Sequence, residues 1–331
     1  MVLILGALIW YVGIGSLYIA LRTIKVTYLC ISFLAYFGIN LLFTVRLRRV
    51  LAREGIRTSF GKTLLAQYAG MLTSDVTPGR SGYVLTPIYL RDQEIPTSVS
   101  LSAVLGIQSV EFLIKVLGGS LAVVYLVYTV NLSQIYFVVA VLGISLMLAG
   151  AVLLAALTWS ESVIGVFNRI AGSRFLGRFA GGLVAKLDQY RTNARKTRRA
   201  IPEIGLITGL CWILKGFEWY FLGNALGITQ IPWIAYFLIH PLVTALAFVP
   251  ITPAGIGVQE FGIIGIFGFL AKALPGVPAT AIQIGAFALL ARCLLIFEDL
   301  AGVPQIAKST SILVFSKETP DKQITQQTLQ P

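Results

Sequence analysis

Phe248-Val249-Pro250-Ile251-Thr252-Pro253-Ala254-Gly255-Ile256-Gly257 interrupts a long apolar region in the second half of the sequence. Proline lacks a backbone N–H and glycine adopts conformations that other residues avoid, so a helix ends where the two residue types gather. The apolar pieces on either side, roughly 232–249 and 258–272, are short for a bilayer that needs about 20 helical residues. The stretch therefore predicts a broken, re-entrant helical hairpin.

A matching break occurs in the first half, where Val76-Thr77-Pro78-Gly79-Arg80-Ser81-Gly82 divides the moderately apolar segment 63–90. Both breaks consist of a β-branched residue followed by Thr-Pro-x-x-x-Gly. Paired interruptions at corresponding places in two halves are typical of transporters. Non-helical backbone persists at membrane depth only inside protein or beside a water-filled cavity. We therefore expect both breaks to face one polar cavity, with a simple proline kink as the alternative for each.

The composition of the chain is that of an integral membrane protein. Of its 331 residues, 56% are hydrophobic and only 12% are charged, whereas soluble domains carry about 25% charged residues. Three cysteines and one histidine provide neither a disulfide framework nor a His-rich metal cluster, so we expect no metal and no cofactor. The net charge of +12 lies in short stretches between apolar runs, and nothing resembles a nucleic-acid module.

The basic clusters orient the chain in the membrane. The stretches 46–62 and 158–202 are rich in arginine and lysine, which places them in the cytoplasm. This orientation predicts an all-α, multi-pass bundle in the cell membrane with both termini cytoplasmic. It has about six full spans and two re-entrant hairpins in an inverted repeat, where hydropathy alone counts seven or eight spans. The spans are expected at roughly 2–20, 26–45, 98–128, 135–157, 203–224 and 279–303, and the hairpins at 63–96 and 232–274.

We expect one integral membrane domain, residues 1–305, followed by a polar tail at 306–331. Its halves, roughly 1–157 and 203–305, are joined by the basic connector 158–202. Apolar residues recur in the connector at helical spacing, which suits a helix lying on the anionic lipids of the inner leaflet. An ordinary solvated connector is the alternative, and the oligomeric state stays open.

Several charged residues fall within apolar runs, where a charge near the bilayer centre costs at least ~2.5 kcal/mol and normally faces a partner or a cavity. Asp75 and Arg80 flank the first break and Glu260 follows the second, so we predict functional roles for these three. The remaining intramembrane charges are expected either in structural ion pairs or on the transport path: Glu111 with Lys115, Lys215 with Glu218, and Arg292 ahead of Glu298 and Asp299.

The segment Phe248 to Glu260 resembles the Pro-x-Thr-Pro-Gly-Gly-x-Gly-x-x-Glu stretch of the lysylphosphatidylglycerol synthase transmembrane region, also called the flippase-like domain family. The earlier Thr77-Pro78-Gly79-Arg80-Ser81-Gly82 resembles that family's Thr-Pro-Gly-x-x-Gly stretch, and Arg292 falls where the family carries an arginine on its last span. Ala254 departs from the family's Gly-Gly. The third full span also departs, because Glu111 is followed by Phe112 rather than arginine.

The resemblance implies lipid handling, because family members move a charged phospholipid between leaflets or serve pathways built on polyprenyl-phosphate or glycolipid carriers. No aminoacyl-transfer domain follows the last span, so lysyl transfer is not implied. The main hypothesis is a flippase, and a membrane-embedded glycosyl- or phosphotransferase or an accessory scaffold is the alternative. No nucleotide motif or metal-binding acidic cluster of the kind such enzymes need occurs in the sequence.

The flippase hypothesis assigns roles to residues at the two breaks. The anionic headgroup of a phospholipid or a polyprenyl-phosphate-linked lipid is expected between them, and Asp75 or Glu260 could bind a coupling proton or cation. Intramembrane charges at Glu111, Lys115 and Arg292 complete the candidate set. The substrate-binding residues are expected to be Thr77, Pro78, Gly79, Arg80, Gly82, Thr252, Pro253, Gly255 and Gly257.

Overall fold

The computed structural model describes residues 18, 22–78, 80–130, 134–159, 198–247, 252 and 255–315. Within these residues all regular structure is helical and no β-strand occurs, which confirms the all-α class. The first expected span, at 2–20, most of the connector 158–202 and the tail from residue 316 lie outside the described residues.

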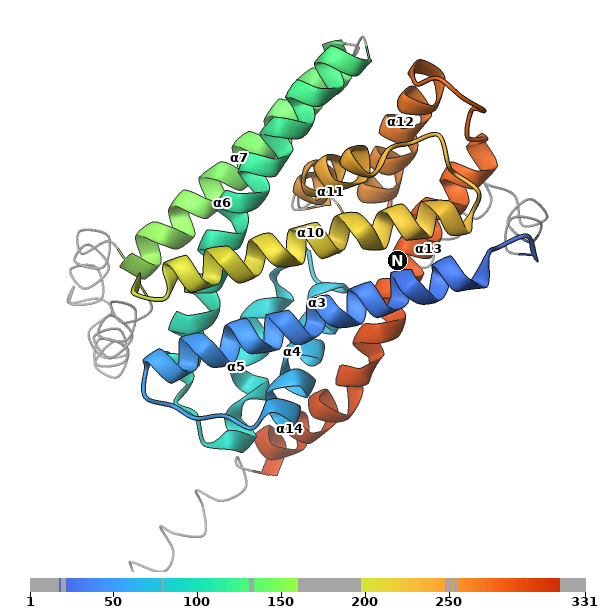
Figure 1. Ribbon diagram of the computed structural model, residues 1–331. Helices are drawn as coiled ribbons and strands as arrows, with labels where there is room; N and C mark the ends of the chain where they lie inside the picture. Colours follow the sequence, from blue (N-terminus) through green and yellow to red (C-terminus); the bar gives the residue numbers. More distant parts are fainter. Residues whose placement is uncertain are drawn as a thin grey trace, which may run out of the picture.

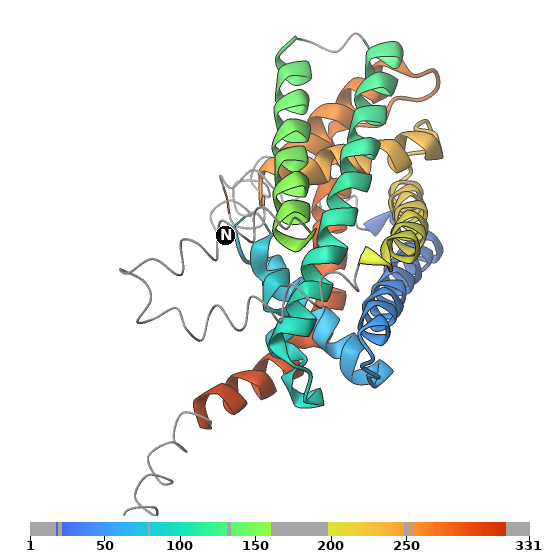
Figure 2. The same ribbon diagram turned by 90° about the vertical axis from the view of Figure 1, so that its left-hand side faces the viewer.

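Two helix pairs frame the molecule. Helix α3 (Val26–Arg53) and helix α10 (Ile201–Ala225) lie side by side across it (Figure 1). Helices α6 (Thr97–Thr129) and α7 (Gln134–Trp159) form a long antiparallel pair that Figure 2 shows from the side. Among the described residues, three helices are long and apolar enough to cross a membrane, namely Val26–Arg53, Thr97–Thr129 and the continuous run Ala281–Ser311. These helices indicate a membrane protein.

The shorter helices fill the space between these pairs. Helix α4 (Phe60–Ser74) precedes the first break, and three short elements follow it: η1 (Ser81–Leu85), α5 (Thr86–Tyr89) and η2 (Arg91–Gln93). Around the second break lie α11 (Trp233–Ala247) and α12 (Val258–Ala273). The chain then continues through α13 (Ala281–Asp299), η3 (Leu300–Gly302) and α14 (Val303–Phe315).

An aromatic core holds the second half together. The Trp219 ring meets the Phe287 ring edge-on, with centroids 5.4 Å apart. Phe267 stacks on Phe287 at 5.2 Å, and Tyr236 lies 5.1 Å from Phe267. Each such pair is worth about 0.5–1.5 kcal/mol beyond the area it buries. These contacts fix α10, α11, α12 and α13 relative to one another, and so position the second break.

The basic stretch 46–62 begins differently from the sequence expectation. Helix α3 continues to Arg53, and Arg46 lies inside it, only 3% exposed, rather than in an exposed loop. The reason is a buried partner on another helix, because Arg46 pairs with Glu111 of α6 at 2.9 Å. Hydropathy counts the charge of Arg46 but cannot show that the Glu111 carboxylate of another helix pairs with it.

The chain stays helical beyond the last span expected from the sequence, at 279–303. Helix α14 continues to Phe315 because polar contacts hold it against the segment after the first break. Gln305 Nε2 donates a hydrogen bond of 2.6 Å to the Tyr89 carbonyl, and Lys308 pairs with Asp92 at 2.8 Å. The chain from α13 to α14 therefore extends well past the last apolar run.

Candidate functional site

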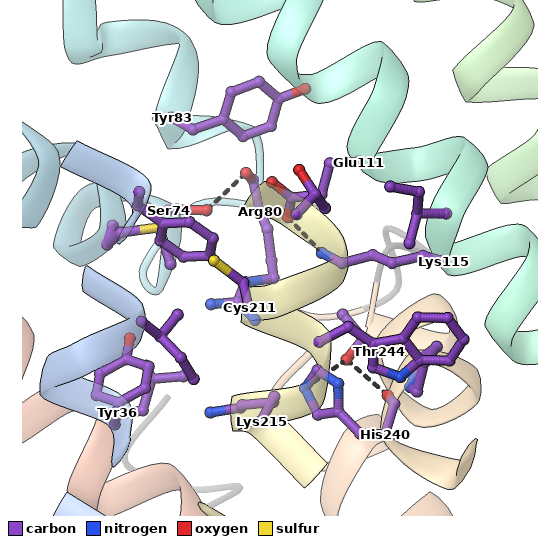
Figure 3. A pocket seen from close by; sticks show the side chains of 18 of the residues that line it. Tyr36, Ser74, Arg80, Tyr83, Glu111, Lys115, Cys211, Lys215, His240 and Thr244 are labelled. Atoms are coloured by element: carbon purple, nitrogen blue, oxygen red, sulfur yellow. Dashed lines mark hydrogen bonds and ion pairs between the residues drawn. The ribbon is translucent and has the colours of Figure 1, made fainter. Parts of the chain in front are cut away.

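A cavity lies among α3, α4, α6, α10, α11 and α13, and Figure 3 shows side chains that line it. It holds about 1010 Å³ of space free of protein atoms, counting the part open to solvent. Ser74, Arg80 and Tyr83 reach it from around the first break, and Gln259 reaches it from the start of α12. Residues at or beside the first break and one residue two positions after the second break, far apart in sequence, thus line one cavity.

The first break is a tight turn held by side-chain hydrogen bonds. Thr77 Oγ1 accepts a hydrogen bond of 2.7 Å from the Gly82 N–H, and Ser74 Oγ donates one of 2.7 Å to the Arg80 carbonyl. Arg80 has φ of +53°, a left-handed conformation that favours glycine and costs other residues on the order of 1 kcal/mol or more. A strained non-glycine residue whose side chain enters a cavity is typical of a functional position.

Gly82 has no room for a side chain. An added Cβ would lie 2.3 Å from the Thr73 carbonyl carbon and 2.4 Å from its oxygen, both backbone atoms. Because that backbone is fixed within α4, we expect Gly82→Ala to lower the free energy of unfolding by about 1–3 kcal/mol. Thermal unfolding in detergent measures this. The matched control is Gly61→Ala in α4, where nothing lies within 4 Å of the added Cβ. An unchanged melting temperature for Gly82→Ala contradicts the close approach.

The second break depends on glycine and on a buried ion pair. Gly255 and Gly257 have φ of +67° and +87°. Glu260 accepts a hydrogen bond of 2.7 Å from the Gly257 N–H on Oε2, and one of 2.7 Å from Arg292 Nε on Oε1. Arg292 also donates to Gln259 Oε1 at 2.9 Å. Glu260 thus caps α12 and joins it to α13, and both of its carboxylate oxygens are engaged.

The other expected substrate-binding residues have varied positions. Thr77 is half-buried and Pro78 is exposed, while Gly79 and Pro253 lie outside the described residues. Thr252 is half-buried, and its Oγ1 is shielded from solvent without a hydrogen-bond partner in the described part of the chain. Around the first break, the side chains that reach the cavity are those of Ser74, Arg80 and Tyr83.

The cavity wall is cationic. Arg80, Lys115 and Lys215 enter it from three different elements, as Figure 3 shows, and Glu111 is the carboxylate that lines it among the described residues. These side chains carry three positive charges and one negative charge, a net of two positive charges. The wall is therefore suited to an anionic group.

Two of these cations pair with carboxylates that do not line the cavity. Arg80 pairs with Asp75 at 2.7 Å, and Lys215 pairs with Glu218 at 2.5 Å. Asp75 and Glu218 are buried, at 1% and 0% exposure. An anion in the cavity therefore meets the cationic side of both pairs, while the carboxylates keep those cations from being isolated inside the protein.

Glu111 connects the cavity to a second, smaller one. Its carboxylate accepts hydrogen bonds from Lys115 at 2.8 Å and from Arg46 at 2.9 Å, and Arg46 also donates to Thr208 at 2.7 Å. The second cavity, of about 410 Å³ with its open part, is lined by Arg46 and Gln67. The two cavities share the lining residues Phe43, Met71, Tyr83, Gln108 and Glu111. The two cavities are therefore neighbours, separated by side chains that include Glu111.

Several lining residues are not among the substrate-binding residues expected from the sequence. Lys215 lies 4.4 Å from the centre of the Tyr36 ring, a cation–π contact that holds its ammonium group in the cavity. The only available signal was a lysine in the middle of an apolar run. His240 also lines the cavity, where its Nε2 lies 3.2 Å from Thr244 Oγ1 beside Pro241. This is the geometry of a hydrogen-bonded histidine within a helix that carries a proline.

Among the described residues, no group of three or more histidine, cysteine, aspartate or glutamate side chains is arranged to hold a metal ion.

Comparison with known proteins gives one finding. The family described as "Lysylphosphatidylglycerol synthase TM region" has a model that matches residues 1–297. This range contains both breaks and the side chains that line the cavity. A comparison with curated proteins found no match.

Proposed function

The chain belongs to the lysylphosphatidylglycerol synthase TM-region family, and we propose from this premise that it is a flippase for anionic lipids. Its substrate is an anionic phospholipid or a polyprenyl-phosphate-linked lipid that moves between the two leaflets. The observation that carries the proposal is the cavity beside the first break, whose wall presents, among the described residues, Arg80, Lys115 and Lys215 against one carboxylate. Family membership supports a membrane-lipid function, and the charge of the wall supports the anionic class.

Headgroup binding follows from the chemistry of the wall. The planar guanidinium of Arg80 can donate two parallel hydrogen bonds to a phosphate, while Lys115 and Lys215 act as point charges. The same cavity has an apolar side, with Ile39, Phe43, Ile114 and Leu295. A lipid offers both surfaces at once, because its phosphate is joined to hydrocarbon that stays with the bilayer. A headgroup of net positive charge, such as a lysylated one, suits this wall less well.

The proposed topology retains about six full spans and two re-entrant hairpins, arranged as an inverted repeat. Helix lengths support the hairpins: α4 and α11 have 15 residues each and α12 has 16. At about 1.5 Å per residue these helices are roughly 22–24 Å long, shorter than a ~30 Å hydrocarbon core. In this topology the tips of both hairpins end within the membrane, where non-helical backbone has to face protein or a polar cavity.

The orientation can be tested by labelling. With the basic stretches 46–62 and 158–202 in the cytoplasm, the turn at Asn131 faces the outside. We expect an Asn131→Cys variant, in a background with the native cysteines replaced by serine, to react with a membrane-impermeant maleimide added to intact cells. A cysteine at Arg57 is the opposite-face control and should react only after lysis. Labelling of Asn131→Cys only after lysis contradicts the orientation.

The function is tested with purified protein in liposomes. Fluorescent phosphatidylglycerol in both leaflets is bleached by dithionite from outside, and a flippase exposes the inner pool at a rate above that of protein-free vesicles. A fluorescent lipid with a cationic headgroup serves as the substrate control and should move more slowly. Protection of the inner pool equal to that in protein-free vesicles, for both phosphatidylglycerol and a polyprenyl phosphate, contradicts the proposal. A new lipid product in mass spectra would instead favour the transferase.

A further inference from the structure

The second, smaller cavity lies next to the first along one face of helix α6. Lys115 lines the first cavity, Glu111 and Gln108 line both, and Val104 lines the second. These four residues are spaced by three or four positions, so they share one face of the helix. At about 1.5 Å of rise per residue, the face from Lys115 to Val104 is roughly 16 Å long. The two cavities therefore follow one another along α6.

Helices α3 and α4 line both cavities in the same way. On α4, Ser74 lines the first cavity, Met71 lines both and Gln67 lines the second. On α3, Phe43 lines both cavities and Arg46 lines the second. In the proposed topology the end of α3 and the starts of α4 and α6 face the cytoplasm. The second cavity therefore lies on the cytoplasmic side of the first.

The charges that line the second cavity balance among the described residues. Its charged lining side chains are Arg46 and Glu111, which pair with each other at 2.9 Å. The first cavity instead presents three cations against Glu111. A phosphate is therefore bound more favourably in the first cavity, and the second suits an uncharged group.

The second cavity offers two amide groups to such a ligand. Gln67 of α4 and Gln108 of α6 line it, and both are half-buried. Neither amide is hydrogen-bonded to another residue in the described part of the chain, whereas those of Gln259 and Gln305 are. Polar groups inside proteins are normally hydrogen-bonded, so these two amides are available to a ligand. An amide both donates and accepts, as a hydroxyl does, so the two groups pair in either direction.

We propose that the second cavity is a subsite for the uncharged, hydroxyl-bearing part of the headgroup, a glycerol or a sugar joined to the phosphate. The inference rests on the proposed function and narrows its substrate class. Arg80 and Lys115 hold the phosphate in the first cavity, while Gln67 and Gln108 bind the hydroxyls. The side chains between the cavities include that of Met71, which is unbranched and has three rotatable bonds, so one headgroup can reach both.

Two pairs of short-chain lipids test the subsite in binding to the detergent-solubilised full chain. Dihexanoyl phosphatidylglycerol and dihexanoyl phosphatidylpropanol have the same charge and differ only in two hydroxyls. Glucosyl citronellyl phosphate and propyl citronellyl phosphate form the corresponding sugar pair. We expect the hydroxyl-bearing member of at least one pair to bind with a Kd about tenfold lower, as one or two ordinary hydrogen bonds provide.

Substitution of the two amides assigns the preference to the second cavity. Gln67→Leu combined with Gln108→Leu should raise the Kd of the hydroxyl-bearing lipid about tenfold and leave that of the propyl lipid unchanged. Each substitution alone should raise it by about threefold, which keeps the test valid if the double variant fails to fold. Gln134→Leu, at the exposed start of α7, is the matched control and should bind both lipids as wild type does.

The outcomes separate the subsite from the proposed function. A preference within the glycerol pair identifies a phospholipid headgroup, and one within the glucose pair identifies a lipid-linked sugar. Equal Kd values within both pairs overturn the inference, as does a preference that survives undiminished in the amide variants. A preference that depends on Gln67 and Gln108, with no flipping of any lipid in liposomes, leaves the subsite standing and removes the flippase. Flipping with equal Kd values within both pairs does the reverse.

Discussion

Lipid translocation should fall by about 100-fold or more when Arg80→Gly is combined with Asp75→Asn, although the protein stays folded. Arg80 is the guanidinium of the cavity and the residue best suited to hold a phosphate by two hydrogen bonds. Glycine removes that group and also relieves the left-handed backbone at φ +53°. Asparagine at position 75 prevents a buried carboxylate from losing its partner, which by itself would cost several kcal/mol.

The double variant thus separates the role of Arg80 in binding from its role in structure. Its flipping rate is measured in liposomes, and its melting temperature and size-exclusion profile in detergent. Asp75→Asn alone is the matched control: it keeps Arg80 and should still move lipid. If the double variant is stable and flips lipid at the wild-type rate, Arg80 does not bind the headgroup. Arg80→Lys keeps the positive charge but cannot donate the two parallel hydrogen bonds of a guanidinium. We expect its flipping rate to fall by an intermediate factor of about tenfold.

The helices were predictable from sequence where apolar runs are bounded by strong breakers. The run expected at 98–128 is α6, Thr97–Thr129, because Pro96 directly precedes it and the long apolar run that follows favours a helix. Interrupted backbone at the first break was equally readable from Pro78 and the clustered glycines. The end of α3 was not predictable, because only the fold brings Glu111 beside Arg46.

The site was predictable only where its contacts are local in sequence. The pair Glu111 and Lys115 follows from helical spacing, since residues four apart share a face, and it lines the cavity. The pairing of Arg292 with Glu260 joins two helices, and no spacing rule connects residues that far apart. Lys215 was visible only as an intramembrane charge. Its place in the wall depends on packing against Tyr36 of α3.

Replacing Glu111 with glutamine should cause the largest loss of stability among single-residue changes near the cavity. Glu111 is 9% exposed and holds two cations, Arg46 and Lys115. Its neutral substitute leaves both of them uncompensated inside the bundle, and breaking a buried pair in this way typically costs about 3–5 kcal/mol. Unfolding by SDS titration in mixed micelles measures the loss. Glu203→Gln breaks an exposed pair with Arg53, and should change stability by no more than about 0.5 kcal/mol.

A second substitution shows whether uncompensated charge is the cause. Lys115→Met on the Glu111→Gln background removes one of the two isolated cations and should recover a substantial part of the lost stability, while Arg46 keeps its hydrogen bond to Thr208. Headgroup binding should change in the opposite direction to stability. Glu111→Gln removes the carboxylate from the cavity wall, so an anionic headgroup should bind more tightly even as the fold weakens, and Lys115→Met should reverse that gain. A stable Glu111→Gln variant, or one with weaker headgroup binding, contradicts a wall whose charge selects the lipid.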